Sequence, residues 1–454
     1  MRSLIIASGF VLLGSSAALA AACDASPTID PSGNSGSAFP GVALFAGDVY
    51  SCNFVADDGV TQVIVPNGTY GVFRTDSRGF QLLAGGDAYD YTVDVDGDVQ
   101  TRTLNGPDDG SDFVYTNYFA TGLVGSDTVF DGDFTFDLTN VSDLGSEVDF
   151  DSIDVAVGYT TLADQEDSLD QIGLQQAGLI THLDAISGLL TSQNLALEAP
   201  DEFGVFGAVG SLTAGGNVRL NLAEGFSVLG GASIVDFSAG DAAASGYLGA
   251  LAVRYVQPDG SDFRYFGEGG VQAGALSVSF MRTYNNGASD YDATGTGDAV
   301  LGAGYIRGGV LWTPDQDNQV VFSATLKQSV LGISSFVEDD PDTAPNFFQA
   351  DMSGTSSTFT TVKAGADWTT KLAADVDLTT SVALGSTMGS GASADVFGVG
   401  TVTGSPQSVL FADYGLRLGW QPNSSSRLDG FVQGSTGVGI GTHAQIGAAY
   451  HQSF

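Results

Sequence analysis

From Phe203 to the end of the chain, apolar and polar residues alternate in short runs, and this two-residue period is typical of β-strands. Within one run, Tyr265 and Val271 share a face while Glu268 lies on the opposite face. Twelve such runs follow one another: 203–211, 216–222, 226–237, 246–257, 263–281, 298–312, 319–333, 357–370, 376–386, 408–421, 427–436 and 442–454. An even number of strands with one apolar and one polar face predicts a 12-stranded antiparallel transmembrane β-barrel.

The connections between these runs differ in length. Residues 223–225, 258–262, 314–318, 372–375 and 422–426 form short connections, whereas 282–297, 334–356 and 388–407 are long. Short and long connections alternate almost throughout. Barrels of bacterial outer membranes carry their short turns on the periplasmic side. We therefore expect the first strand to begin, and the last strand to end, on that side.

Charged residues in these runs indicate which face points into the lumen. A Lys or Arg on the lipid face at the bilayer midplane costs about 2–4 kcal/mol, so charges are expected inside. The residues predicted to face the lumen are Arg254, Arg264, Glu268, Lys327, Lys363, Asp367, Asp413 and Arg417. On the outer face, aromatic residues are expected to form girdles at the membrane interfaces: Trp312, Trp368, Trp420 and Tyr450.

The period changes to 3.6 residues between Ser168 and Leu197, which predicts one amphipathic helix. Ser168 and Gln171 are positioned to form a capping box at its start. Roughly 24 helical residues would span about 36 Å, enough to run through a barrel. A helix packed on a soluble domain and a coiled-coil linker are alternatives. The position directly before the first strand favours a helix inside the lumen, where Gly173, Gly178 and Gly188 would suit close confinement.

The N-terminus predicts export. Arg2, an apolar stretch at 4–13 and the sequence Ala18-Leu19-Ala20 fit a signal peptide that is removed after about residue 20. Cys23 and Cys52 are the only two cysteines and follow that signal, so we expect them to pair, with roughly 3 kcal/mol of stabilisation. Lipidation of Cys23 is the alternative, although Ala20 stands where a Leu is usual.

Residues 21–163 form a separate acidic segment. It contains 23 acidic and three basic residues, a balance of −20, and the whole chain carries −39. This charge excludes nucleic acids as partners, because the phosphates would repel the protein. Short β-prone runs are separated by clusters of Gly, Asp, Asn and Pro, and no period of 20–50 residues is present. A compact β-sandwich is the predicted fold of this segment.

The acidic segment offers little catalytic chemistry. All three histidines lie in the predicted helix or the last strand: His182, His443 and His451. The segment therefore cannot build a Ser-His-Asp or Cys-His site from its own side chains. Acidic pairs such as Asp57 and Asp58 are expected by chance among so many carboxylates. We do not expect an enzyme.

One group of carboxylates resembles a calcium loop: Asp94, Asp96 and Asp98. However, the glycine is the fourth rather than the sixth residue, and Asn105 occupies the place of the expected bidentate Glu. A β-hairpin that turns at Asp96 and Gly97 is the preferred interpretation. Calcium stays the alternative, and no other cofactor is expected.

The order of these parts resembles the autotransporter family, in which an export signal, a surface passenger, a pore helix and a C-terminal barrel follow one another. The resemblance divides the chain into a signal peptide (1–20), an acidic passenger (21–163), a linker and pore helix (164–199) and a barrel (200–454). It implies a Gram-negative outer membrane, display of the passenger at the cell surface for adhesion or surface interaction, and outer-membrane lipid, the barrel-assembly machinery and a surface ligand as partners.

In this family the last strand is recognised by the assembly machinery, which implies that role for Ile446, Ala448, Tyr450 and Phe454. Gln452 departs from the family pattern, because an apolar residue is usual there. Some members cleave the pore helix at paired Asn residues, but this helix has only Asn194, so that cleavage is not expected. A diffusion channel with a periplasmic N-terminal domain is the alternative function.

Overall fold

The computed structural model describes residues 35–37, 42–44, 49–53, 64–81, 89–95, 98–104, 112–126, 128–129, 133–137, 148–191, 199–258, 262–287, 290–339 and 346–454. The chain folds as two compact units, Met1–Tyr159 and Thr160–Phe454. The predicted signal peptide and Cys23 lie outside the described residues. Signal cleavage and the Cys23–Cys52 disulfide therefore stay predictions.

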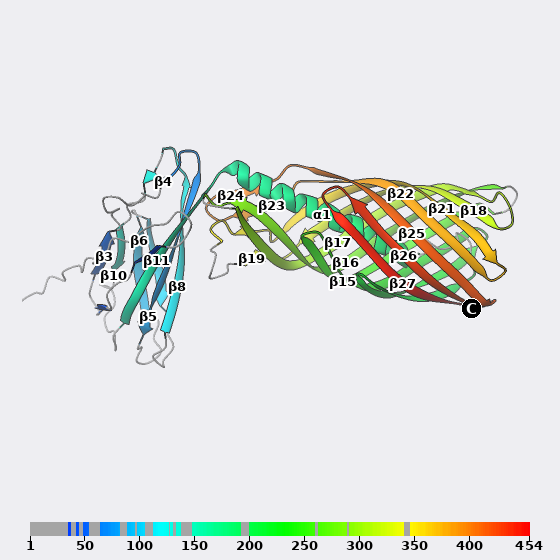
Figure 1. Cartoon of the computed structure of the whole chain (residues 1–454), viewed down its shortest axis with the longest axis horizontal. Coiled ribbons are helices and arrows are strands. Elements are labelled where there is room, and N and C mark those ends of the chain that lie inside the picture. Colours follow the sequence, from blue (N-terminus) through cyan, green and yellow to red (C-terminus); the bar gives the residue numbers. More distant parts are fainter. Residues whose placement is uncertain are drawn as a thin grey trace, which may run out of the picture. The chain divides into compact units, whose positions relative to one another are not determined.

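The first unit is built from β-strands, shown in blue and cyan in Figure 1. One sheet has the order β1-β11-β5-β8 with β2 on β11, a second has the order β3-β10-β6-β7, and β4 pairs with β9. Their bounds are β1 Ser35–Ser37, β2 Val42–Leu44, β3 Val49–Asn53, β4 Ile64–Val65, β5 Tyr70–Gln81, β6 Tyr89–Val95, β7 Asp98–Leu104, β8 Asp112–Leu123, β9 Thr128–Val129, β10 Asp133–Asp137 and β11 Val148–Thr160. Most side chains between these sheets lie outside the described ones, so the sandwich packing stays a prediction.

The two strands of the preferred hairpin are present in this unit. β6 and β7 pair antiparallel with Val95 opposite Asp98, so that residues 96 and 97 connect them. This is the pairing that the sequence favoured over a calcium loop. Asp96 lies outside the described residues, as do the side chains of Asp94 and Asp98. The calcium alternative stays untested.

The second unit is a closed barrel of twelve long antiparallel strands (Figure 1). They are β12 Glu202–Val209, β13 Leu212–Ala223, β14 Phe226–Ala239, β15 Ala242–Val256, β16 Phe263–Asn285, β17 Asp290–Trp312, β18 Asn318–Ile333, β21 Thr355–Ala373, β22 Val376–Gly389, β25 Gln407–Asn423, β26 Ser426–Gly437 and β27 Gly441–Ser453. Each strand pairs with its neighbour in the chain, and β12 pairs with β27 to close the ring. The predicted fold class is confirmed for the barrel.

The outer wall of the barrel is apolar. Along β12, buried and exposed residues alternate without a break. Large apolar side chains point outward all around the wall, among them Tyr247, Leu384 and Leu410, each about two-thirds exposed. Removing one such side chain from water is worth about 1.5–3 kcal/mol, and soluble proteins rarely carry so continuous a patch. The wall is therefore stable in lipid, and the barrel is a transmembrane barrel.

The two ends of the barrel differ. At the turn end, residues 224–225, 257–262, 313–317, 374–375 and 424–425 connect the strands. The loop end carries the longer connections, but 210–211, 240–241 and 438–440 are also short there, so the expected alternation of short and long connections is wrong on this side. Gly210 and Gly240 adopt positive φ angles of 101° and 61°, which lets two-residue turns close these hairpins.

At the loop end, a small sheet continues the barrel wall. β16 and β17 pair over their full 23 residues, to Asn285 opposite Asp290, so part of the predicted loop 282–297 is strand. Four short strands extend this sheet: β19 Val337–Glu338, β20 Ala350–Asp351, β23 Ser393–Val396 and β24 Gly400–Thr403. We call these four strands, together with residues 282–285 and 290–297, the loop sheet.

The helix α1 (Leu162–Leu190) lies inside the barrel. It contacts β13, β14, β15 and β16 on one side and β21, β22, β25 and β26 on another, which places it within the ring (Figure 1). Twenty-nine residues give a length of about 44 Å. Within the described part of the chain, no helix has both the length and the apolar character needed to cross a membrane.

The predicted start of this helix is wrong. Thr161 is the N-cap: its Oγ1 accepts a hydrogen bond from the Asp164 amide at 3.0 Å, and the Asp164 carboxylate accepts one from the Thr161 amide at 3.3 Å. This capping box satisfies two amides that have no partner within the helix. Ser168, the predicted cap, lies inside α1 and its hydroxyl donates to the carbonyl oxygen of Gln165.

Candidate functional site: the lumen and its helix

The chain passes through the lumen in one direction. Near the loop end, the side chain of Gln175 exchanges two hydrogen bonds with the backbone of Met281 on β16, at 2.6 and 3.1 Å. Further down, Asn217 Nδ2 donates to the carbonyl oxygen of Leu189 at 2.8 Å. At the turn end, Asn221 Nδ2 donates to the carbonyl oxygen of Ala199 at 3.0 Å. The polypeptide therefore enters α1 at the loop end and leaves the lumen where β12 begins.

Halfway down the lumen, a carboxylate of α1 is held by two wall lysines. Asp184 Oδ1 lies 3.0 Å from Lys327 Nζ on β18, and Asp184 Oδ2 lies 2.7 Å from Lys363 Nζ on β21. Lys363 Nζ also contacts Asp413 Oδ2 at 3.0 Å. Lys327 is 1% exposed, so this ion pair is shielded from solvent. We call Lys327 and Lys363 the lysine pair.

The C-terminal end of α1 meets a buried arginine. Arg254 donates to Glu268 Oε2 at 2.7 Å and to the carbonyl oxygen of Thr191 at 3.2 Å. Tyr305 donates its hydroxyl to Glu268 Oε1 at 2.7 Å. Unsatisfied carbonyls make a helix C-terminus negative, so a cation here stabilises the seated helix.

A second arginine ties the loop sheet to the first turns of α1. Arg282 is 1% exposed and holds Glu338 of β19 through two hydrogen bonds of 2.7 and 2.8 Å. It also donates to Gln165 Oε1 of α1 at 2.6 Å and to the carbonyl oxygen of Phe348 at 2.6 Å. One side chain thus connects a barrel strand, two loop segments and the helix.

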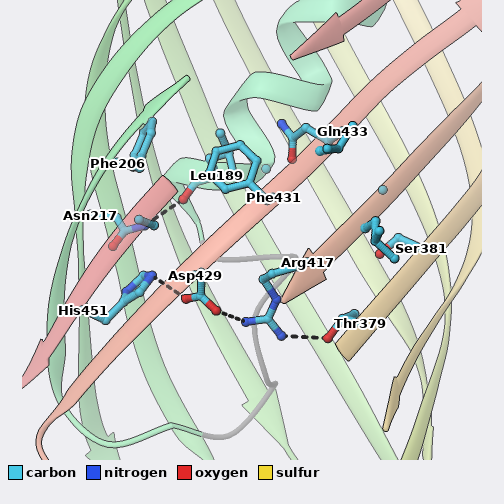
Figure 2. Close-up of a pocket in the computed structure, with 15 residues that line it drawn as sticks. Leu189, Phe206, Asn217, Thr379, Ser381, Arg417, Asp429, Phe431, Gln433 and His451 are labelled. Atoms are coloured by element: carbon cyan, nitrogen blue, oxygen red, sulfur yellow. Dashed lines mark hydrogen bonds and ion pairs between the residues drawn. The ribbon is translucent and has the colours of Figure 1, made fainter. Parts of the chain in front are cut away.

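Near the turn end, polar wall residues surround a cavity below α1 (Figure 2). Arg417 donates to Asp429 at 3.3 Å and to Thr379 at 2.8 Å, and His451 Nε2 lies 3.4 Å from Asp429. The cavity measures about 50 Å³ and shares Gly188 with a neighbouring cavity of about 90 Å³. Since one water needs about 10–15 Å³, both are large enough to hold several waters.

Two histidines lie close together in the lumen. His182 Nδ1 on α1 lies 2.6 Å from Ser435 Oγ, and its Nε2 lies 3.4 Å from the carbonyl oxygen of Ile440. The His443 ring is 5.1 Å away between centroids. In a Ser-His-Asp triad the second ring nitrogen faces a carboxylate, whereas in His182 it faces a carbonyl oxygen. The described residues contain no group of three or more His, Cys, Asp or Glu that could hold a metal ion.

Aromatic side chains ring the outer wall at the turn end. Trp368 and Trp420 are about half exposed, and each indole N–H donates to a polar residue in or beside a turn, Asn318 at 3.2 Å and Asp375 at 3.0 Å. Trp312 stacks on Phe263 of the next strand at 5.9 Å. Amphipathic rings are enriched where lipid meets water, so the turn end lies at a membrane interface.

Comparisons with known proteins found similar structures but no similar sequence. No family model and no curated protein matches the chain. Among solved structures, the translocator domain of the autotransporter NalP from Neisseria meningitidis is 12% identical with a TM-score of 0.40, over 59% of this chain and 92% of that chain. The β-domain of the Bordetella autotransporter BrkA is 14% identical with a TM-score of 0.37, over 56% and 99%. The monoaromatic hydrocarbon channel CymD is 6% identical with a TM-score of 0.34, over 56% and 88%.

The residues predicted to face the lumen lie on the inner side of their strands. Arg254, Glu268, Lys327 and Arg417 are buried, whereas Arg264, Lys363, Asp367 and Asp413 are partly exposed to the lumen. On β27, Ile446 and Phe454 point outward and are well exposed, Ala448 lies on the same exposed face, and Tyr450 is half-buried there.

Three functional residues were missed by sequence reasoning. Asp184 could be identified only once the rotation of α1 about its axis was known, because that rotation decides which side chains face the lysines. Arg282 lies in a segment predicted to be a loop. Asp429 accepts hydrogen bonds from the arginines of the turn-end cluster. A charged residue with inward parity was the available signal for Asp429, because it follows the same alternation as the predicted lumen residues. No local pattern distinguished Arg282, whose partners are distant in the chain.

Proposed function

We propose that this protein is an outer-membrane translocator and anchor of the autotransporter type, which displays the acidic segment at the surface of a Gram-negative cell. The direction of the chain through the barrel carries this proposal. α1 enters the lumen at the loop end and Ala199 lies at the turn end. Because short turns face the periplasm, residue 160 leaves the barrel on the outer side of the membrane.

The inner wall supports passage of a polar chain. Its inward side chains include serine, threonine, glutamine, histidine and paired charges, and several of their buried polar atoms have no protein partner, among them Ser329 Oγ and Gln445 Nε2. Such atoms are satisfied by water or by a polar polypeptide. A lumen of this kind suits the hydrated acidic segment. We propose adhesion or another surface contact as the role of the displayed domain, with the assembly machinery acting on β27.

A diffusion channel is the second function to consider. A channel with a periplasmic N-terminal domain needs residue 160 at the turn end, whereas Thr161 caps α1 at the loop end. The cavities of about 50 and 90 Å³ beside α1 are also far smaller than a solute pathway. Both observations favour the translocator.

Protease added to whole cells tests the proposal. An epitope tag after residue 25 is expected to be lost from intact cells, while a tag in the turn 315–317 survives. Protection of the N-terminal tag until the outer membrane is permeabilised would contradict surface display and favour the channel. Heat-modifiable migration on a gel provides the control that the barrel is folded in both tagged proteins.

A further inference from the structure

Within the lysine pair, Lys363 contacts the wall carboxylate of Asp413, whereas Lys327 differs from the basic residues that have a wall partner. Arg254 and Arg417 each have a wall carboxylate as partner, Glu268 and Asp429 respectively. The ion pair of Lys327 is instead with Asp184 of α1. Wall carboxylates therefore pair with Arg254 and Arg417, whereas the carboxylate that pairs with Lys327 comes from α1, which fills the lumen.

The geometry around Asp184 is that of a carboxylate receptor. Lys327 and Lys363 lie on neighbouring strands, with Thr325 opposite Lys363 and Lys327 opposite Thr361 in the register. Each ammonium group contacts a different oxygen of the same carboxylate. When α1 is absent from the lumen, two lysines and Asp413 remain, a net charge of +1 on this part of the wall.

We infer that the lysine pair binds carboxylates of the acidic segment as that segment passes through the barrel, and that Asp184 of α1 takes this place when passage is complete. This inference rests on the proposed function. It assigns to Lys327 and Lys363 the role of selecting for an acidic polypeptide, and to Asp184 that of the final occupant.

The composition of the acidic segment matches this site. Its 23 acidic residues are spread over the 143 positions from 21 to 163. One carboxylate thus occurs about every six residues, or about 20 Å of extended chain. A barrel crosses roughly 25 Å of hydrocarbon, so each stretch inside the lumen brings a carboxylate near the lysine pair. In a hydrated lumen such a contact is worth about 0.2–1 kcal/mol, weak enough to be released as the chain moves.

The test compares two passengers in two barrels. The full chain with Lys327→Gln and Lys363→Gln is followed by pulse-chase labelling and external protease on whole cells. Surface display of the acidic segment is expected to slow by about fivefold, which corresponds to about 1 kcal/mol at the barrier. A chain whose acidic segment carries Asp→Asn substitutions at most positions is expected to show no difference between the two barrels.

Equal slowing of both passengers, or of neither, overturns the inference. Should the double substitution block barrel assembly, Lys363→Gln alone is compared with Lys371→Gln, an exposed lysine on the same strand. The first is expected to slow only the acidic passenger and the second neither, and equal behaviour overturns the inference in this arm too. A wild-type chain that displays neither passenger contradicts the proposed function and this inference together.

Discussion

The guanidinium of Arg254 and the carbonyl oxygen of Thr191 meet at 3.2 Å, where the last turn of α1 ends inside the barrel. Arg254 Nε also donates to Glu268 Oε2 at 2.7 Å, and the Arg254 side chain is fully buried. A wall arginine thus neutralises a wall glutamate and also fixes the negative end of the helix. The positive charge of Arg254 therefore serves two purposes: it pairs with Glu268 in the wall, and it stabilises the C-terminal end of α1.

Arg254→Gln is expected to destabilise the barrel strongly. Breaking a buried ion pair by removing one partner costs about 3–5 kcal/mol, because Glu268 would stay charged without its cation. The measurement is the temperature at which the heat-modifiable form is lost. Lys371→Gln, which replaces an exposed lysine near the turn end of β21, is the control and is expected to change this temperature little. A similar small change in Arg254→Gln would contradict the role assigned to Arg254.

Gly178 of α1 packs closely against Ile440, in the short connection between β26 and β27. A Cβ atom added there would lie 2.8 Å from Ile440 Cγ2 and 3.0 Å from Ile440 Cβ. Gly178→Val is therefore expected to displace the middle of the helix and raise the single-channel conductance. Gly178→Val with Ile440→Ala should restore the low conductance, because the smaller side chain removes the clash. Wild-type conductance in Gly178→Val alone would show that the helix has room at this position.

Deletion of residues 165–198 tests whether the helix closes the pore. Without α1 the lumen loses the side chains that fill it, so single-channel conductance is expected to rise several-fold above that of the intact chain. Planar-bilayer recording on the purified, folded protein gives the comparison. An unchanged conductance would place the helix outside the conducting path and contradict its position in the structure.

Phe454→Ala is expected to impair barrel assembly while export continues. Phe454 is 71% exposed on the outer face, and its amide donates to the carbonyl oxygen of Asp201, next to the first strand. Gln452 on the same strand is polar, so this strand end has less apolar surface than it would have with an apolar residue there. The expected result is a protease-sensitive periplasmic form that lacks heat-modifiable migration. Normal levels of the folded form would leave Phe454 as an ordinary lipid-facing residue.

The twelve strands were predictable because lipid imposes a rule on every second residue of each strand. Tyr265 and Leu410 had to face outward whatever their neighbours in space, so the local pattern was sufficient. The existence of α1 was also predictable from a local pattern, because its apolar residues recur at the helical period. The predicted start, Ser168, lies seven residues too late, because Thr161 and Asp164 form a capping box before the apolar stripe begins.

The loop sheet and the partners of the lumen charges were not predictable. β19 and β20 have two residues each and exist only because β17 and β23 offer them hydrogen-bonding partners. The partner of Lys327 depends on the rotation of α1, which packing against the whole ring decides. Sequence parity places a charge inside the barrel, but it does not select which of several inward carboxylates that charge contacts.

The orientation of the chain in the membrane is the central claim, and labelling of single cysteines with a membrane-impermeant thiol reagent on intact cells tests it most directly. In a background with Cys23→Ser and Cys52→Ser, Leu162→Cys reports the exposed start of α1 and Asp317→Cys reports the turn between β17 and β18. Labelling of Leu162→Cys from outside, with Asp317→Cys labelled only after the outer membrane is permeabilised, is the expected result. The reverse pattern would mean that the chain enters the barrel from the periplasm and would contradict the account.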